Sequence, residues 1–210
     1  MRGCSDAGGD VSPANGHTAR ILGCVRSDLP SLARDIGVPE RSLRRAVQRG
    51  TVRARRPGPR QVDLDAGERA YLRENWPLIA AVSEALRVER NVRLAVLFGS
   101  SARGNSGEGS DVDLLVSLVQ ERPLYRAQLA ARLSHALARD VDVVLLEQAR
   151  EREPVLLDEI LREGRPIVDR DGSWSTLLAD RATVARAAIM ARRTRHRRAV
   201  KAVAQLAGSA

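Results

Sequence analysis

The chain has 210 residues, of which 43% are hydrophobic and only 2% aromatic, and its formal net charge is +9. This length and apolar content predict one or two small domains with aliphatic cores. The sequence contains no apolar run of bilayer length and no signal-peptide core near its first residue, which excludes membrane-spanning and secreted classes and favours the cytoplasm. Cys4 and Cys24 have no metal-type neighbours, so they are interpreted as free thiols.

The positive charge is concentrated in two segments. Residues 26–60 contain 10 Arg and 3 acidic residues, and residues 173–210 contain 8 basic residues and 1 acidic residue. Between them, residues 61–172 contain 15 Arg and 20 acidic residues. Basic segments of this size suit polyanionic partners such as DNA, RNA or an acidic protein face, whereas an acidic middle segment suits a cation-binding site.

The first 62 residues divide into two predicted parts. Residues 1–19 are rich in Gly, Ser, Asp and Asn and are interpreted as a disordered leader. Residues 20–62 indicate a helix-turn-helix-like module, in which Asp28 caps a first helix and Gly37 supplies the turn. Residues 51–60 are suited to a wing-like hairpin after the second helix.

The second helix of this module leaves a polar side for solvent or for a DNA major groove. The candidate DNA-contacting residues are Arg41, Ser42, Arg44, Arg45 and Arg49. The positions Ala33, Gly37, Val38 and Leu43 resemble the pattern of many bacterial helix-turn-helix modules. A two-helix module that serves only for packing is the alternative.

Residues 63–89 are predicted to form a connecting helix. Asp65 and Glu68 have the spacing of a capping box, and Pro77 is expected to kink or split the helix.

Residues 90–172 alternate apolar runs of strand and helix type, which predicts an α/β or α+β layer. The expected strands are 92–98, 111–118 and 141–146, and the expected helices are 99–104, 124–139 and 154–163. Residues 173–210 are predicted to be one long helix over 173–206, apolar in its first half and basic in its second. Three interpretations of this basic half stay open: a solvated helical tail, a contact for RNA, or a docking site for an acidic partner.

Chemistry-bearing residues follow the first of these strands. Gly99 and Ser100 come directly after an apolar run, and Asp111 and Asp113 open the next one. Side chains two residues apart on a strand project to the same side, and two carboxylates placed there repel unless a cation lies between them. Mg²⁺ prefers carboxylate and phosphate oxygens, so the spacing favours metal-dependent phosphoryl or nucleotidyl transfer.

The run LFGSSARGNSGEGSDVDLLV resembles the signature of polymerase-beta-type nucleotidyltransferases, and it is most similar to the minimal nucleotidyltransferases. The resemblance extends over about residues 90–170. It implies an α+β nucleotidyltransferase fold with a small mixed sheet and flanking helices. It also implies a third carboxylate on a later strand, for which Asp142 is the candidate and Asp140 the competitor.

The resemblance implies a role for each site residue. Gly99 and Ser100 would position the β- and γ-phosphates, and Asp111, Asp113 and Asp142 would hold two Mg²⁺ ions. Asp142 would also accept the proton of the acceptor hydroxyl. Arg103 would contact a phosphate or remain an exposed helix charge, and Ser110 would shape the turn before Asp111.

The function implied is transfer of a nucleoside monophosphate, expected to be AMP from ATP, to a hydroxyl on a protein or an RNA such as tRNA. Minimal nucleotidyltransferases often act as antitoxins of HEPN-domain ribonucleases, so the resemblance makes a HEPN toxin a candidate partner. The alternative is a DNA-binding regulator whose nucleotidyltransferase-like domain senses nucleotide, although a sensor has no need of three carboxylates. An antibiotic-modifying adenylyltransferase is disfavoured by the basic C-terminal segment.

Overall fold

The structure is a computed structural model, and it describes residues 29–58, 61–105, 107 and 109–207. The predicted leader, the Asp28 cap and both cysteines lie outside the described residues. The elements follow one another as α1 (Leu29–Asp35), α2 (Glu40–Arg49), β1 (Arg55–Gly58), β2 (Gln61–Asp63), α3 (Ala66–Arg87), β3 (Val92–Phe98), α4 (Gly99–Arg103), β4 (Val112–Leu118), α5 (Tyr125–Leu137), β5 (Val141–Leu145), α6 (Leu146–Arg152), α7 (Pro154–Glu163), β6 (Arg165–Asp169), α8 (Ser173–Ala179) and α9 (Arg181–Ala207).

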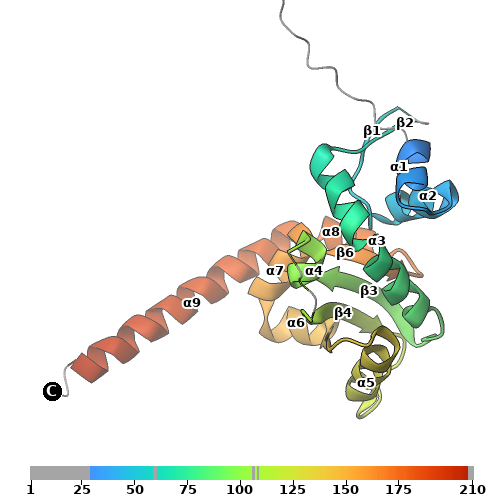
Figure 1. The fold of residues 1–210 in the computed structure, drawn as a ribbon. Helices are drawn as coiled ribbons and strands as arrows, with labels where there is room; N and C mark the ends of the chain where they lie inside the picture. The colour runs from blue at the N-terminus through green and yellow to red at the C-terminus, as the bar shows by residue number, and fades with distance from the viewer. Residues whose placement is uncertain (1–28, 59–60, 106, 108, 208–210) are drawn as a thin grey trace, which may run out of the picture.

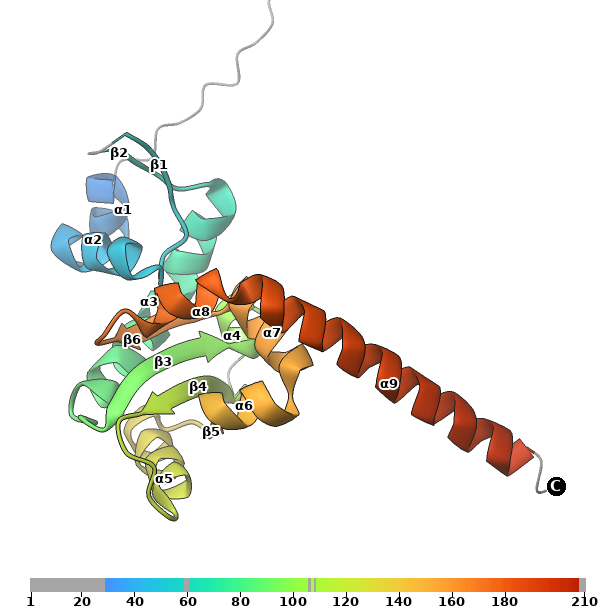
Figure 2. The ribbon, with the colours of Figure 1, turned by 180° about the vertical axis from the view of Figure 1, so that it is seen from behind.

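A four-stranded mixed sheet forms the centre of the molecule (Figure 1), and its strand order is β5-β4-β3-β6 (Figure 2). Strand β3 is antiparallel to both β4 and β6, whereas β4 and β5 are parallel. A parallel pair needs a crossover connection, and α5 supplies it between β4 and β5. The α+β class with a small mixed sheet and flanking helices is therefore confirmed.

Both faces of the sheet are buried, which explains why its strands are apolar at nearly every position. Along β3, Ala95 and Leu97 pack in one cluster with residues of α3 and α5. Leu94, Val96 and Phe98 alternate with them and pack in a second cluster with residues of α7 and α8. The central strands are thus fixed between two helical layers.

Two elements have the bounds that were predicted, namely the strand over 92–98 and the helix over 154–163. Three others differ from the observed bounds by one or two residues at their ends: the predicted helix over 124–139 and the predicted strands over 111–118 and 141–146. Helix α6 was not predicted. The single helix expected over 173–206 is wrong, because the chain divides at Asp180 into α8 and α9. Helix α8 packs on β6 while α9 packs along α7, and one straight helix cannot follow both surfaces.

Helix α3 differs from its prediction in two ways. It runs unbroken from Ala66 to Arg87 with Pro77 inside it, so it is not split. The side chain of Asp65 accepts a hydrogen bond from the Glu68 N–H at 2.7 Å, which is one half of a capping box. The other half is absent because the Glu68 carboxylate is buried in an ion pair with Arg165.

The N-terminal module is continuous with the body. Helices α1 and α2 are joined by a turn at Gly37 (φ +68°), and β1 and β2 form an antiparallel pair in the place of the predicted wing-like hairpin. Leu32 and Leu43, from the two helices, belong to the same buried cluster as the α3 side of the sheet. The module is therefore docked on the body rather than separated from it by a linker.

Helix α9 leaves the body and projects away from it for much of its length (Figure 2). Within the part of the chain that the structure describes, no helix combines the length and the apolar character needed to cross a membrane.

Candidate active site

The candidate site lies where β3 passes into α4, beside the first residues of β4. Phe98, the last residue of β3, is paired with Asp113 across the antiparallel ladder. Gly99 follows with φ +68°, a conformation that favours glycine. A Cβ at Gly99 would collide with the carboxylate of Asp113, so glycine is needed for the carboxylate to lie against this turn.

Replacing Gly99 with Ala is therefore expected to displace Asp113 and to strain the backbone. The left-handed conformation alone costs about 1 to 2 kcal/mol for a residue with a Cβ. We expect a lower free energy of unfolding in urea titrations and loss of any activity that depends on Asp113. The matched control is Gly109→Ala, since Gly109 also has a positive φ but a Cβ there would meet no atom within 4 Å. Equal loss of activity in both variants would contradict the assignment of Gly99.

Asp142 lies level with Asp113 on the neighbouring strand. The two residues are register partners of the parallel pair β4–β5, and register partners project to the same side of a sheet. Asp140 precedes β5, and its carbonyl accepts a hydrogen bond from the Val112 N–H at 2.8 Å. The register thus favours Asp142 over Asp140 as the third carboxylate.

The electrostatics of Asp113 support the same grouping. Burial raises the pKa of the Asp113 carboxyl, and the charges of Asp142 and then Asp111 raise it further, while Arg103 acts in the opposite direction. A carboxyl whose pKa is raised by neighbouring negative charges marks a place where a cation is favoured.

The three carboxylates are of the ligand type that Mg²⁺ prefers, but their side chains do not form a compact cluster. Among the described residues, no group of three His, Cys, Asp or Glu side chains lies close enough together to hold a metal ion as it stands. The donors are suitable, because Asp111, Asp113 and Asp142 are hard oxygen ligands that repel one another.

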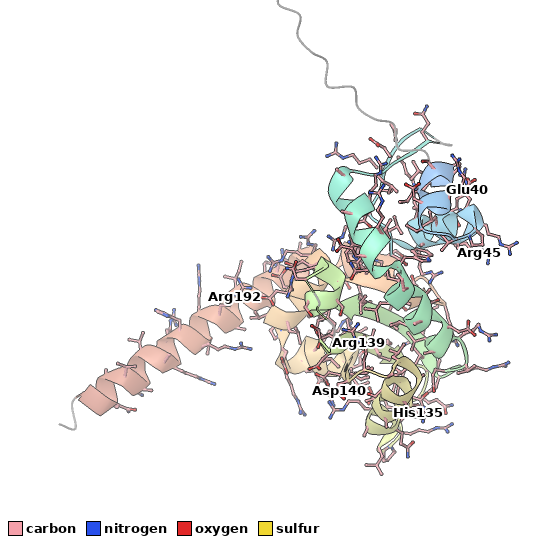
Figure 3. The ribbon with its side chains drawn as sticks, viewed as in Figure 1. Glu40, Arg45, His135, Arg139, Asp140 and Arg192 are labelled. Carbon is pink, nitrogen blue, oxygen red and sulfur yellow. The ribbon has the colours of Figure 1, made fainter. Side chains whose placement is uncertain are left out.

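The loop before β4 is held by two interactions. The Ser110 hydroxyl accepts a hydrogen bond from the Gly107 N–H at 3.0 Å, which agrees with the predicted role of Ser110 in shaping the turn before Asp111. The Arg139 guanidinium donates to the Ser110 carbonyl at 2.6 Å and to the Gly107 carbonyl at 3.2 Å. Arg139 is labelled in Figure 3, next to Asp140. Sequence reasoning missed Arg139, because nothing in its local sequence distinguishes it from other loop arginines.

Comparison with known families agrees with this geometry. Residues 81–173 match the family model described as polymerase beta, nucleotidyltransferase. This segment therefore has the sequence features of the polymerase beta nucleotidyltransferase family, and we call it the nucleotidyltransferase domain. No curated protein matches the sequence significantly.

Solved structures of toxin–antitoxin complexes are similar in fold. A toxin–antitoxin crystallised with AMP-PNP is 24% identical with a TM-score of 0.48, over 59% of this chain and 98% of that chain. An MntA–HepT complex is 22% identical with a TM-score of 0.45, over 60% of this chain and 98% of that one. A chain from the structure of a tri-AMPylated Shewanella oneidensis HEPN toxin in complex with an MNT antitoxin is 20% identical with a TM-score of 0.42, over 62% of this chain and 98% of that one.

Three predicted phosphate-binding residues of the nucleotidyltransferase domain lie on α4, namely Gly99, Ser100 and Arg103. Ser100 is half-buried in its first turn. The Arg103 guanidinium forms an ion pair with Glu163 of α7 at 3.0 Å, and both side chains are nearly half exposed. Arg103 would therefore have to exchange Glu163 for a phosphate in order to contact a nucleotide.

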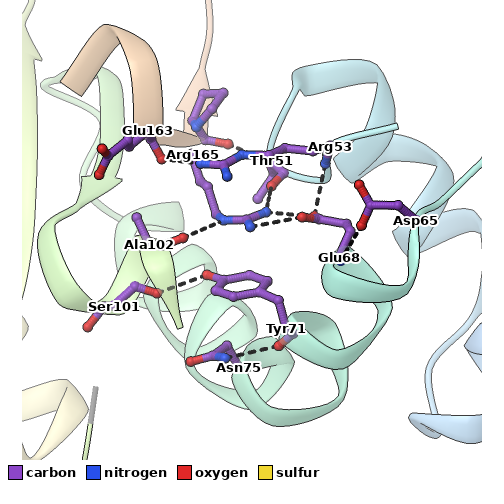
Figure 4. A network of polar contacts seen from close by, with 11 residues as sticks. Thr51, Arg53, Asp65, Glu68, Tyr71, Asn75, Ser101, Ala102, Glu163 and Arg165 are labelled. Atoms are coloured by element: carbon purple, nitrogen blue, oxygen red, sulfur yellow. Dashed lines mark hydrogen bonds and ion pairs between the residues drawn. The ribbon is translucent and has the colours of Figure 1, made fainter. Parts of the chain in front are cut away.

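A buried arginine, Arg165, contacts α4 (Figure 4). The Arg165 guanidinium donates to the Ala102 carbonyl at 2.9 Å and to the Thr51 carbonyl at 3.0 Å. It also forms a bidentate ion pair with Glu68, at 2.6 and 2.9 Å, and lies 3.5 Å from the centre of the Tyr71 ring. The side chain of Arg165 is only 2% exposed and that of Glu68 only 4%.

The same network joins three parts of the chain. The Tyr71 hydroxyl donates to the Ser101 carbonyl of α4 at 3.0 Å, and the Glu68 carboxylate accepts from the Arg53 N–H at 2.9 Å. The N-terminal module, α3 and the nucleotidyltransferase domain therefore meet at one buried ion pair next to the candidate site. Sequence reasoning gave Glu68 only a capping role and Arg165 none.

The predicted DNA-contacting residues of α2 differ in their exposure and in their contacts. Arg49 is half-buried, donates to the Ile167 carbonyl, and has a pKa lowered by burial and then by the charge of Arg45. Ser42, Arg45 and Arg49 line a cleft of about 250 Å³ between α2 and α3. Arg44 pairs with Glu40, and Arg41 is exposed. DNA binding by this helix remains a prediction.

Proposed function

We propose that the protein transfers a nucleoside monophosphate from a nucleoside triphosphate to a hydroxyl group. The observation that carries the proposal is the placement of Asp113 between Asp142, its register partner, and the turn at Gly99, whose missing side chain leaves room for the carboxylate. The family of the domain supports nucleotidyl transfer as the reaction class.

The step is an in-line displacement. The acceptor oxygen forms a bond to the α-phosphorus, the bond from that phosphorus to the bridging oxygen of the β-phosphate breaks, and pyrophosphate leaves. Asp142 accepts the proton of the acceptor hydroxyl, and Gly99 and Ser100 position the β- and γ-phosphates. Mg²⁺ held by Asp111, Asp113 and Asp142 would neutralise the phosphate charges.

The proposed donor is ATP, and the proposed acceptor is a hydroxyl of a HEPN-type toxin protein or of an RNA such as tRNA. The HEPN partner rests on the resemblance of the Gly-Ser and Asp-x-Asp signature to minimal nucleotidyltransferases. The RNA acceptor rests on the basic segments at 26–60 and 173–210, which flank the acidic nucleotidyltransferase domain.

The test offers the purified protein each α-labelled nucleoside triphosphate with Mg²⁺, and with total tRNA or a HEPN protein encoded beside it as acceptor. We expect label to pass to one acceptor. The matched pair of variants is Asp142→Asn and Asp140→Asn, two exposed carboxylates only two residues apart. Transfer should be lost in Asp142→Asn, by about a thousandfold or more, and retained in Asp140→Asn.

Two outcomes would overturn the proposal. If the protein binds nucleotide but transfers label to neither acceptor, the regulator with a nucleotide-sensing domain becomes the better interpretation. If Asp140→Asn loses transfer and Asp142→Asn keeps it, the roles assigned from the strand register are wrong.

A further inference from the structure

Helix α9 has two halves with different surroundings. Its first half packs along α7, where Val184 and Ala188 are buried. At Arg192 the helix still contacts the body, through an ion pair with Glu159 of α7 at 3.2 Å. Figure 3 labels Arg192 on α9. Beyond that point it projects away from all other elements (Figures 1 and 2).

The projecting half is strongly basic. No Asp or Glu occurs in the sequence of α9. The basic residues from the point where it leaves the body are Arg192, Arg193, Arg195, Arg197, Arg198 and Lys201. Among the described residues, none of these except Arg192 has an ion-pair partner, and all of them are exposed.

This charge distribution is unfavourable for a free helix. Arg193 and Arg197 are four residues apart, as are Arg197 and Lys201, and like charges at this spacing repel and destabilise a helix. No apolar packing compensates, since the helix is exposed along this stretch. A polyanion bound along this half would relieve the repulsion.

The placement of the cations around the helix distinguishes between polyanions. With about 100° between successive residues, the six basic residues are spread over the whole circumference rather than along one stripe. An acidic face of a protein would meet only one side of such a helix. A groove with phosphates on both walls would meet cations on opposite sides at once.

We propose that the projecting half of α9 binds in the major groove of duplex DNA. That groove is about 12 Å wide and admits an α-helix, whereas the major groove of duplex RNA is deep and too narrow to be entered in this way. The stretch from Arg192 to Lys201 is about 15 Å long, which spans several base pairs. The proposal does not rest on nucleotidyl transfer, since DNA binding is measured without nucleotide.

The experiment measures the binding of the full-length protein to short fluorescent duplex DNA by anisotropy, over a series of salt concentrations. The variant carries Arg195→Gln, Arg197→Gln and Arg198→Gln, because Gln keeps helix propensity and removes charge. The matched control carries Arg90→Gln, Arg122→Gln and Arg152→Gln, three exposed arginines of the body. Circular dichroism checks that the helix content of both variants is unchanged.

We expect the wild type and the body control to bind duplex DNA with a steep salt dependence. The logarithm of the association constant should fall with the logarithm of the salt concentration, and the slope should be less negative by about 3 in the α9 variant. The reason is that each of the three arginines neutralises one phosphate in the wild type. Equal slopes in the α9 variant and the wild type would overturn the proposal, even if other parts of the chain bind DNA. Tighter binding to duplex RNA, or displacement of DNA by polyglutamate at equal charge, would assign the helix to RNA or to an acidic protein instead.

Discussion

Replacing Asp113 with Asn is expected to abolish nucleotidyl transfer while making the metal-free protein more stable at neutral pH. Asp113 is held against the turn at Gly99 and beside Asp142, which suits a ligand for a cation but is unfavourable for an unneutralised charge. Asn has the same shape without the charge, so it removes the repulsion together with the proposed function. Transfer should fall by about a thousandfold or more.

The pH dependence of stability follows from the pKa of Asp113. Burial, Asp142 and Asp111 raise this pKa above its ordinary value of 3.8. The folded protein therefore binds the proton more tightly than the unfolded chain does, and the free energy of unfolding decreases as the pH rises from about the ordinary pKa through the raised one. At neutral pH the destabilisation is fully present, and the Asn variant should lack this part of the pH dependence.

The measurement is the free energy of unfolding in urea at several pH values, with and without Mg²⁺. Mg²⁺ should stabilise the wild type, because it binds only the folded site, and should have little effect on Asp113→Asn. Asp140→Asn is the control, and its stability and Mg²⁺ response should equal those of the wild type. An Asp113→Asn variant less stable than the wild type at neutral pH would show that the carboxylate serves the fold instead.

Replacing Glu68 with Gln is expected to lower the free energy of unfolding by about 3 to 5 kcal/mol, because the substitution leaves the buried Arg165 charge without its counter-charge. Arg165 also bonds the carbonyls of Ala102 and Thr51, so the substitution would loosen α4 and the N-terminal module together. Arg165→Met should be destabilising for the same reason, since it leaves the Glu68 carboxylate buried.

A double-mutant cycle in urea titrations separates the ion pair from other packing. The double variant Glu68→Leu/Arg165→Met removes both charges and should be more stable than the sum of the single changes predicts. Glu84→Gln is the control, because the Glu84–Arg87 pair is similar in geometry but its side chains are 68% and 71% exposed. We expect no measurable change there, and an equal decrease in Glu84→Gln and Glu68→Gln would contradict the role of burial.

The sequence by itself determined the elements around the site. The apolar run over 92–98, the Gly99–Ser100 pair and the Asp111–Asp113 spacing are local patterns, and local patterns report strands and turns directly. The same holds for α7, whose opening Pro154 and closing Gly164 mark its ends. The candidate carboxylates were therefore available before any tertiary information. The alternation of strands and helices left α/β and α+β open, and the family resemblance implied the α+β class.

Only the tertiary structure favours Asp142 over Asp140 as the third carboxylate, because the register of β4 against β5 cannot be read from the sequence of either strand. Tertiary packing also determines that Arg49 donates to the Ile167 carbonyl of β6. Similarly, the Glu68 carboxylate pairs with Arg165, which is 97 residues away, instead of completing the capping box. Contacts over such separations depend on how distant elements pack, and no local periodicity encodes them. In the same way, the sequence showed that the end of α9 is basic, and the fold showed that it projects beyond the rest of the protein.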